Sequence, residues 1–232
     1  MQGKGTSFFE WGYSKNSYFS GNLVHTTGVD QTITYTDFSI VDQSVTPKVA
    51  LVPSTAFSTQ FHAQFGFYFR NKYALSLAID QMKFVVNQKN VNLPFVYNQL
   101  NGVLFPKLMF VRTDKWSGSY DQIWTLLFNY SVGVGPLFSS TNYISGDNKN
   151  EKVFSMSGLG ITIQTGPRFV WRQRFYLSPS VAISYLHQSR VAISSAIDEF
   201  MSQKIGVVSA QVVGGFYLHK RKSGGCMTCP EW

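Results

Sequence analysis

Apolar and polar side chains alternate along several stretches of this chain. In residues 61–69 the odd positions carry aromatic or small apolar side chains, and the even positions carry mostly polar or small ones. The same period of two recurs in residues 73–80, 123–135, 158–171 and 175–186. This period is typical of a β-strand whose two faces meet different surroundings. The five segments therefore predict β-strands.

The last strand of this kind runs over about residues 205–219, with apolar side chains at alternate positions. Two weaker stretches, residues 7–20 and about 102–112, complete the set of predicted strands. Residues 31–41 form either a further strand or a hairpin that stands up from the first long loop. The chain is therefore predicted to be all-β, with about eight strands and with ten as the second choice.

The predicted connections alternate in length. Two of them, at residues 70–72 and 172–174, are tight turns. The others are long and polar, at 21–56, 87–101, 138–156 and 187–203. Long loops at one end and short turns at the other are the plan of outer-membrane barrels. The sequence thus predicts an antiparallel up-and-down transmembrane β-barrel.

Composition favours lipid around this barrel over the alternative, a soluble lipocalin-like barrel with its apolar face inside. Charged residues make up 14% of the chain, whereas a soluble domain carries about 25%. The polar strand faces are rich in Gly, Ser, Ala and Thr, whose small side chains suit the narrow lumen of an eight-stranded barrel. Membrane barrels also carry interfacial aromatic girdles. The aromatic residues near predicted strand ends are Tyr73, Trp116, Tyr120 and Trp171.

No transmembrane helix is expected, because no apolar run reaches about 18 residues. The first residues, Met1–Gly5, lack the apolar core of a signal peptide. An exported barrel therefore requires that the sequence is a mature form, and the alternative is a protein that was never exported. We expect residues 1–219 to form the barrel and residues 220–232 to form a short periplasmic tail.

Basic residues gather where the predicted barrel has its short turns. The net charge is +8, and both tight turns are doubly basic. If the short turns are periplasmic, these side chains form one rim that could meet anionic phospholipid headgroups. The simpler interpretation is that solvated turns favour Lys and Arg, and no nucleic-acid motif accompanies the charge. The basic residues of this rim are Arg70, Lys72, Arg172, Arg174, Lys220, Arg221 and Lys222.

Charged residues also fall on the predicted inward faces. They are Glu10, Asp80 and Arg168, with His62 and Gln64 nearby in the pattern. Because buried charges need partners, we expect Arg168 to pair with Glu10 or Asp80 in a lumen plugged by side chains. A path for protons or a solute is the alternative, but an eight-stranded barrel is only wide enough for its own side chains.

Three segments carry a family resemblance. They are FGFYFRNKYALSLAIDQMKFVV (65–86), GITIQTGPRFVWRQRFYLSPSVAISYLHQS (160–189) and QVVGGFYLHK (211–220). They resemble a family of small outer-membrane β-barrel proteins from Bacteroidota, of the eight-stranded OmpA/OmpX type. The resemblance covers most of residues 57–219, and residues 80–83 are its most specific piece. It implies an outer-membrane location, and it supplies no catalytic residues.

His187 and Ser189 are the sharpest enzymatic possibility. Two residues apart on a strand, they share one face, so the histidine could activate the serine hydroxyl. With Asp198 or Glu199 as the orienting acid, they resemble the arrangement in outer-membrane lipid A deacylases. The acid spacing and the missing asparagine-rich signature depart from that family, and the strand phase puts His187 on the outer face. We therefore expect no catalytic site, and a polar strand end is the plainer interpretation.

Both cysteines lie in the tail, as Cys226-Met227-Thr228-Cys229. A single CxxC can hold half a zinc site, form a tight disulfide or do redox chemistry, but no second ligand pair accompanies it. The tail follows the flexible spacer at 223–225 and ends in Trp232, an apolar anchor for a partner. We expect a docking or structural tail, with an inert tail as the alternative, and no metal or cofactor.

The favoured function is a non-catalytic accessory subunit of a larger outer-membrane protein assembly, because no catalytic set emerges. The alternatives are a lipid A-modifying enzyme and a narrow channel or small-ligand-binding barrel. The expected partners are outer-membrane lipid or lipopolysaccharide and other outer-membrane proteins, without nucleic acid. We expect the long loops to be extracellular, and the short turns and both termini to be periplasmic.

Overall fold

The protein is all-β in the part of the chain that the computed structural model describes. The described residues are 5–27, 31–35, 39–42, 60–87, 95–117, 123–145, 151–193 and 199–218. Within these ranges no helix is long and apolar enough to cross a membrane.

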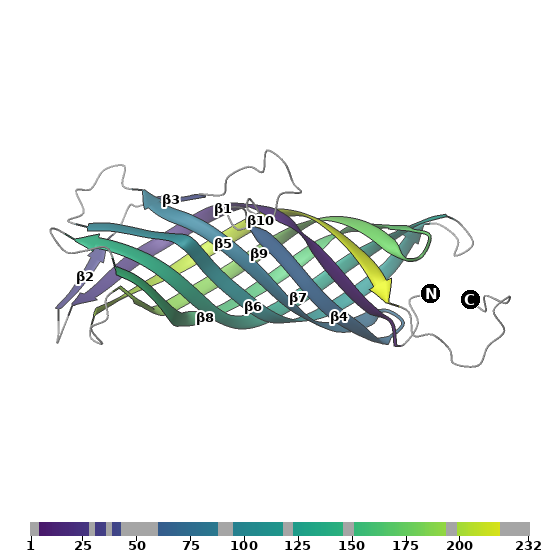
Figure 1. Cartoon of the computed structure of the whole chain (residues 1–232), viewed down its shortest axis with the longest axis horizontal. Helices are drawn as coiled ribbons and strands as arrows, with labels where there is room; N and C mark the ends of the chain where they lie inside the picture. The colour runs from purple at the N-terminus through teal and green to yellow at the C-terminus, as the bar shows by residue number, and fades with distance from the viewer. Residues whose placement is uncertain are drawn as a thin grey trace.

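Eight long strands make up the body of the molecule, and their ribbons wind around one axis (Figure 1). The long strands are β1 (Ser7–Thr27), β4 (Phe61–Arg70), β5 (Tyr73–Asn87), β6 (Phe95–Ser117), β7 (Trp124–Ser145), β8 (Glu151–Trp171), β9 (Phe175–Ala192) and β10 (Glu199–Leu218). Two short strands, β2 (Gln31–Tyr35) and β3 (Ser39–Asp42), lie near the end opposite the termini (Figure 1).

The long strands close into a ring because β1 pairs with β4 on one side and with β10 on the other. Every other long strand pairs antiparallel with its neighbours in chain order. The end of the barrel opposite the tight turns is called the upper end. There β2 pairs with β1, and β3 pairs with β5 beyond the stretch that β4 occupies. The predicted up-and-down barrel of eight strands is therefore confirmed, and β2 and β3 bring the sheet to ten strands.

The outer surface carries an apolar band of membrane height. On β9 every second residue from Phe175 to Tyr185 points outward, and all of these side chains are apolar. Ten residue steps of about 3.3 Å, inclined by about 40° to the barrel axis, span about 25 Å, which matches the lipid-facing band of membrane barrels. The outward residues of β5 from Leu75 to Ile79 continue the band on the opposite wall.

The tight turn between β8 and β9 has an unusual composition. Arg172 and Gln173 both have positive φ, 46° and 59°, and Arg174 N donates to the Trp171 carbonyl at 3.1 Å. Two left-handed residues at the tip of a hairpin match the right-handed twist of the strands that they join. The start of β1 and the end of β10 lie at the same end of the barrel as this turn, because Ser7 pairs with Leu218 and Tyr217 N donates to the Arg174 carbonyl.

The prediction of four long polar loops was wrong for most of the residues concerned. Strands β1, β6, β7, β8, β9 and β10 all continue into those stretches, so that β6 already begins at Phe95 and β7 ends only at Ser145. Beyond the lipid the outward face of a strand becomes polar, and the contrast between the two faces fades while the backbone pairing continues. At the upper end, opposite the tight turns, the paired strands therefore extend well beyond the apolar band.

Candidate functional site

A charged cluster fills the middle of the lumen, and each of the eight long strands contributes one side chain to it. The members of this central cluster, in chain order, are Glu10, His62, Asp80, Lys107, Asn129, Arg168, Tyr176 and Tyr217. Glu10 and Asp80 carry two negative charges, and Lys107 and Arg168 carry two positive charges, so their formal charges balance.

Arg168 is the most connected member of the central cluster. Its Nη2 lies 2.5 Å from Glu10 Oε2, and its Nη1 donates to the Tyr217 hydroxyl at 3.2 Å. The guanidinium also stacks 4.1 Å from the centre of the Tyr176 ring. With its amide oxygen turned toward Arg168, Asn129 accepts from Nε and Nη2 at 2.8 and 2.9 Å. Arg168 is only 2% exposed, so these partners replace the water that the charge would otherwise need.

Asp80 links the other half of the cluster. Its Oδ2 lies 2.5 Å from Lys107 Nζ, and its Oδ1 lies 2.6 Å from His62 Nδ1. The other ring nitrogen of His62 lies 3.6 Å from Glu10 Oε1 and 3.3 Å from Gln64 Oε1. His62 thus joins the Asp80–Lys107 pair to the Glu10–Arg168 pair, and one chain of charged groups runs across the lumen.

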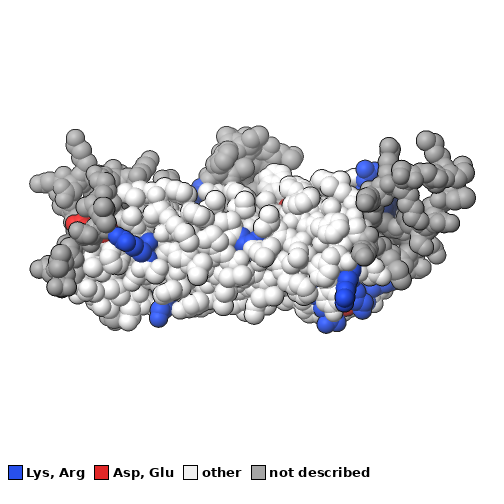
Figure 2. Space-filling model, turned by 90° about the horizontal axis from the view of Figure 1, so that it is seen from below, with Lys and Arg blue, Asp and Glu red and all other residues white. Residues whose placement is uncertain are grey.

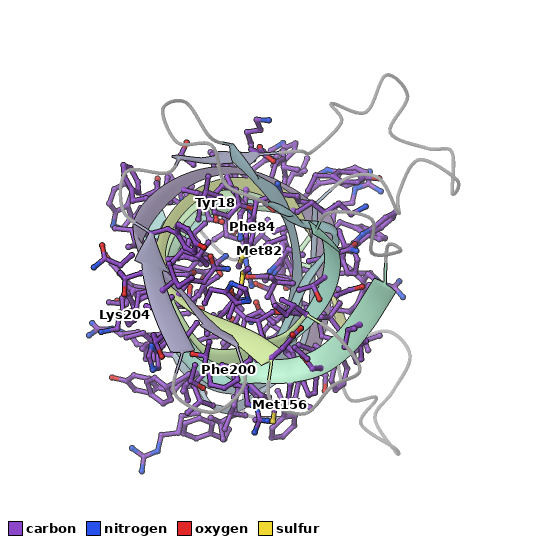
Figure 3. All side chains as sticks on the ribbon, turned by 90° about the vertical axis from the view of Figure 1, so that its left-hand side faces the viewer. Tyr18, Met82, Phe84, Met156, Phe200 and Lys204 are labelled. Atoms are coloured by element: carbon purple, nitrogen blue, oxygen red, sulfur yellow. The ribbon has the colours of Figure 1, made fainter. Side chains whose placement is uncertain are left out.

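Two layers of apolar side chains enclose the central cluster. The lower layer, toward the tight turns, packs against the rings of Tyr176 and Tyr217 of the central cluster and consists of Phe8, Tyr68, Ala74, Ala78, Met109, Val111, Leu127 and Val170. The upper layer consists of Ile40, Met82, Phe84, Val103, Phe105, Leu137, Leu186, Ile205 and Val207, with Tyr18 packed against it. Seen from the upper end, Tyr18, Met82 and Phe84 point into the barrel (Figure 3). Side chains therefore fill the lumen at three successive levels.

A small polar recess lies beside Arg168. It is lined by Glu10 and Arg168 and by small or amide side chains that include Ser131, Gln164 and Ser180. Its free space is about that of one water molecule. The recess suits a buried water better than a passing solute.

The structure places all five predicted lumen residues inside the barrel. Each is at least nine-tenths buried, and Arg168 pairs with Glu10, one of the two carboxylates that the sequence offered. Gln64 donates to the Ser76 hydroxyl at 2.7 Å.

Sequence reasoning missed four members of the central cluster. The inward position of Lys107 could have been predicted, because Lys107 shares its strand face with the apolar residues Phe105 and Met109. Tyr176 and Tyr217 had only the phase of their strands, which puts them on the other face from Phe175 and Phe216. Their residue type gave no signal, since an aromatic side chain suits lipid and lumen equally well.

Strands β1 and β3 face each other in the wall without a backbone ladder, and side chains close this seam. Strand β4 begins only at Phe61, so it pairs with the lower part of β5, where His62 lies opposite Asp80. Strand β3 pairs with the upper part of β5, where Asp42 lies opposite Phe84, and so takes the place of β4 in the wall. Among the described residues no strand pairs with residues 15–22 of β1 on this side.

Gln60 is the centre of this seam. Its carbonyl accepts from Ser14 N at 3.1 Å, and its side chain hydrogen-bonds Asn16, Tyr18 and Asp42. Lys15 reaches over the seam from β1, with its Nζ 2.6 Å from Asp42 Oδ2. Side-chain bonds thus hold together two strand edges that lack a backbone ladder.

His187 and Ser189 share the outer face of β9, and both are exposed. Glu199 does not approach them, because it pairs with Thr27 at the upper end of β10, whereas His187 pairs with Lys204. Five residues of strand separate these two levels, about 17 Å. Asp198 lies outside the described residues. The arrangement therefore brings no described carboxylate to His187.

The predicted basic rim and the predicted aromatic residues share one end of the barrel. Arg70, Lys72, Arg172 and Arg174 are exposed there, whereas residues 220–222 lie outside the described residues. On the face drawn in Figure 2 the middle of the molecule is mostly uncharged, and basic atoms gather toward the end that holds the termini in Figure 1.

Aromatic rings line the same rim. Trp171 stacks on Trp124 with ring centres 6.3 Å apart, and Trp116 stacks on Phe128 at 4.7 Å. Tyr73 stacks on Phe110 at 5.7 Å, and Tyr120 lies outside the described residues. Trp124 and Phe128, which were not among the predicted aromatic residues, belong to this girdle as well.

The tail residues Cys226, Cys229 and Trp232 lie outside the described residues. Within the described ranges, no group of three or more His, Cys, Asp or Glu side chains is placed to hold a metal ion.

Comparison with solved structures identifies the fold. The chain resembles the outer-membrane protein AlkL in lipid bilayers, with a TM-score of 0.50 at 8% identity over 96% of this chain and 94% of AlkL. OprG from Pseudomonas aeruginosa gives 0.49 at 13% identity over 95% of this chain and 100% of OprG. The attachment invasion locus protein of Yersinia pestis gives 0.40 at 10% identity over 93% of this chain and 99% of that protein.

Comparison at the level of sequence adds no relatives, since no protein-family model and no curated protein matches the chain. At these identities structural likeness concerns the fold alone, and the likeness to AlkL, with its TM-score of 0.50, is the one that supports it here. The chain therefore has the fold of small outer-membrane β-barrel proteins.

Proposed function

We propose that this chain is a sealed outer-membrane β-barrel that acts through its surfaces, as an accessory subunit of a larger outer-membrane protein assembly. The observation that carries the proposal is the filled lumen, in which the central cluster lies between two apolar layers. A barrel with such a core offers little space for a solute path. The surfaces available for binding a partner are then the outer wall and the upper end of the barrel.

The proposed orientation puts the tight turns and both termini in the periplasm and the extended upper strands outside the cell. Short turns on the periplasmic side and longer elements outside are the usual plan of bacterial barrels. The apolar band of about 25 Å fits the hydrocarbon layer, and the tryptophan-rich girdle lies at its lower edge. The basic rim then faces the headgroups of the inner leaflet.

An apolar patch above the band supports a protein partner. Phe154 and Met156 of β8 are 66% and 59% exposed, and the Phe154 ring stacks parallel to that of Phe138 with centres 6.0 Å apart. Phe154 lies five residues beyond Leu159 toward the upper end, about 17 Å along the strand. Exposed apolar surface outside the lipid is typical of a docking site.

The test is purification of the full chain from its native membrane in gentle detergent, with mass spectrometry of whatever accompanies it. We expect a partner in near-stoichiometric amount with the wild-type chain and with Ile33→Ser, a control on β2, which pairs with β1 away from the patch. The double variant Phe154→Ser/Met156→Ser should lose most of that partner. A clean monomer from wild-type membranes contradicts the accessory role.

A further inference from the structure

The upper edge of the apolar band on β9 and β10 is marked by basic side chains. His187 is the next outward residue after Tyr185 on β9, and Lys204 of β10 pairs directly opposite it. Both side chains are exposed, and Lys204 points away from the barrel (Figure 3). Residues directly opposite each other in an antiparallel pair have Cβ atoms about 5 Å apart. Two basic groups are therefore held side by side just where the band ends.

A third basic group lies one level higher on the same wall. Arg190 is exposed on β9, and its guanidinium lies 5.3 Å from the centre of the Phe200 ring. Three residues separate it from His187, about 10 Å along the strand. In the described part of the chain, neither the Lys204 nor the His187 side chain forms an ion pair or a hydrogen bond. Basic side chains directly opposite each other repel when both are charged, so an anion between them would be favourable.

The surface directly below these groups suits acyl chains. One residue pair below Lys204 and His187, toward the lipid, the outward residues are Phe19, Tyr185 and Ile161, and Leu159 lies level with His187 on β8; all four are well exposed. On β9 and β10 the wall thus changes from apolar to cationic within one residue pair, while the neighbouring β8 stays apolar. A molecule that matches it carries anionic groups directly above hydrocarbon chains.

We propose that His187, Arg190 and Lys204 form a binding site for a phosphorylated glycolipid whose headgroup carries more than one phosphate. This site rests on the proposed placement in the membrane, and it specifies the class of lipid that the outer wall binds. Lys204 and His187 take one phosphate between them, because an ammonium and an imidazole N–H both donate to phosphate oxygens. The guanidinium of Arg190 takes a second phosphate, and the acyl chains lie on Leu159, Ile161 and Tyr185.

The chemistry favours this occupant over a lipid with a single phosphate. Three donors spread over about 10 Å along two strands exceed the reach of one phosphate group. Each basic side chain near an anionic lipid surface contributes about 1 kcal/mol, which is about a fivefold change in retention. Loss of two charges should therefore weaken retention by about twenty-five-fold.

The experiment is native mass spectrometry of the full chain from vesicles of phosphatidylcholine that contain diphosphorylated lipid A, dephosphorylated lipid A or phosphatidylglycerol. We expect the wild-type chain to retain diphosphorylated lipid A, and Arg190→Gln/Lys204→Gln to lose it by about twenty-five-fold. The control Arg70→Gln/Arg174→Gln removes the same charge at the other rim and should retain the lipid. Lys204→Arg, which keeps the charge, should retain it as well.

Three outcomes overturn the site. Equal losses in the two double variants mean non-specific charge attraction, equal retention of dephosphorylated lipid A means that the phosphates are not recognised, and equal retention of phosphatidylglycerol means that one phosphate suffices. A shift in gel mobility between unboiled and boiled samples shows that each variant is a folded barrel. A folded, inserted wild-type chain that retains no lipid A refutes the glycolipid site alone and leaves the sealed barrel standing.

Discussion

Arg168→Met tests the central cluster directly. The substitution removes a guanidinium that bonds Glu10 and Tyr217 and keeps a side chain of similar length. Glu10, itself 2% exposed, is then left as a buried carboxylate without its strongest partner. Breaking a buried ion pair in this way costs about 3–5 kcal/mol of the free energy of unfolding. We expect Arg168→Met to fall in that range.

A double-mutant cycle separates the unpaired charge from lost packing. In Glu10→Gln/Arg168→Met no uncompensated charge remains at this pair, and replacing both members of a buried pair is often nearly neutral. The double variant should therefore be at least about 2 kcal/mol more stable than Arg168→Met alone. Arg174→Met, at an exposed position of the tight turn, serves as the control and should stay within about 0.5 kcal/mol of wild type.

The assay is reversible urea unfolding in lipid vesicles, followed by tryptophan fluorescence and by the difference in gel mobility between unboiled and boiled samples. A loss below about 1 kcal/mol for Arg168→Met would refute the account of a tightly coupled charge cluster. So would a double variant whose loss equals the sum of the two single losses, because additivity means that the two groups do not interact.

Three further predictions concern packing, the seam and orientation. Gly12→Ala should cost about 1–3 kcal/mol, because a Cβ there would lie 2.1 Å from the Val212 carbonyl oxygen. Gly214→Ala, with nothing within 4 Å, should be close to neutral in the same urea assay. Gln60→Ala should speed hydrogen exchange in β3 and leave β9 unchanged, because it removes the bonds that close the seam; unchanged exchange in β3 contradicts that account. Both cysteines should react with an impermeant maleimide only after the outer membrane is opened, and labelling of intact cells reverses the proposed orientation.

The strands and the predicted lumen residues followed from the sequence because the two faces of a membrane strand differ sharply. Period-two alternation gives each strand a phase, and the phase alone puts Glu10, His62 and Arg168 inside. The sequence could not decide between Glu10 and Asp80 as the partner of Arg168. That choice depends on the register of all eight strands, which sets the distances across the lumen.

Other features lay beyond the sequence for different physical reasons. Two patterns hid the apolar layers inside the barrel. Phe105 lies between the apolar residues Leu104 and Pro106, so its strand shows no alternation there, whereas around Met82 the alternation is reversed, because the outward neighbours Gln81 and Lys83 are polar. The full lengths of β6 and β7 were missed because beyond the lipid neither face is uniformly apolar. The seam at Gln60 requires β3 to continue the line of β4 across a break in the chain, which no local pattern encodes.

The most direct test of the sealed barrel is the ion conductance of the purified full-length chain in planar lipid bilayers. Each sample is first shown to be folded by different gel mobilities before and after boiling. The account predicts conductance indistinguishable from that of detergent alone, because the central cluster and two apolar layers fill the lumen. Reproducible single-channel steps of uniform size from the folded wild-type chain would contradict it.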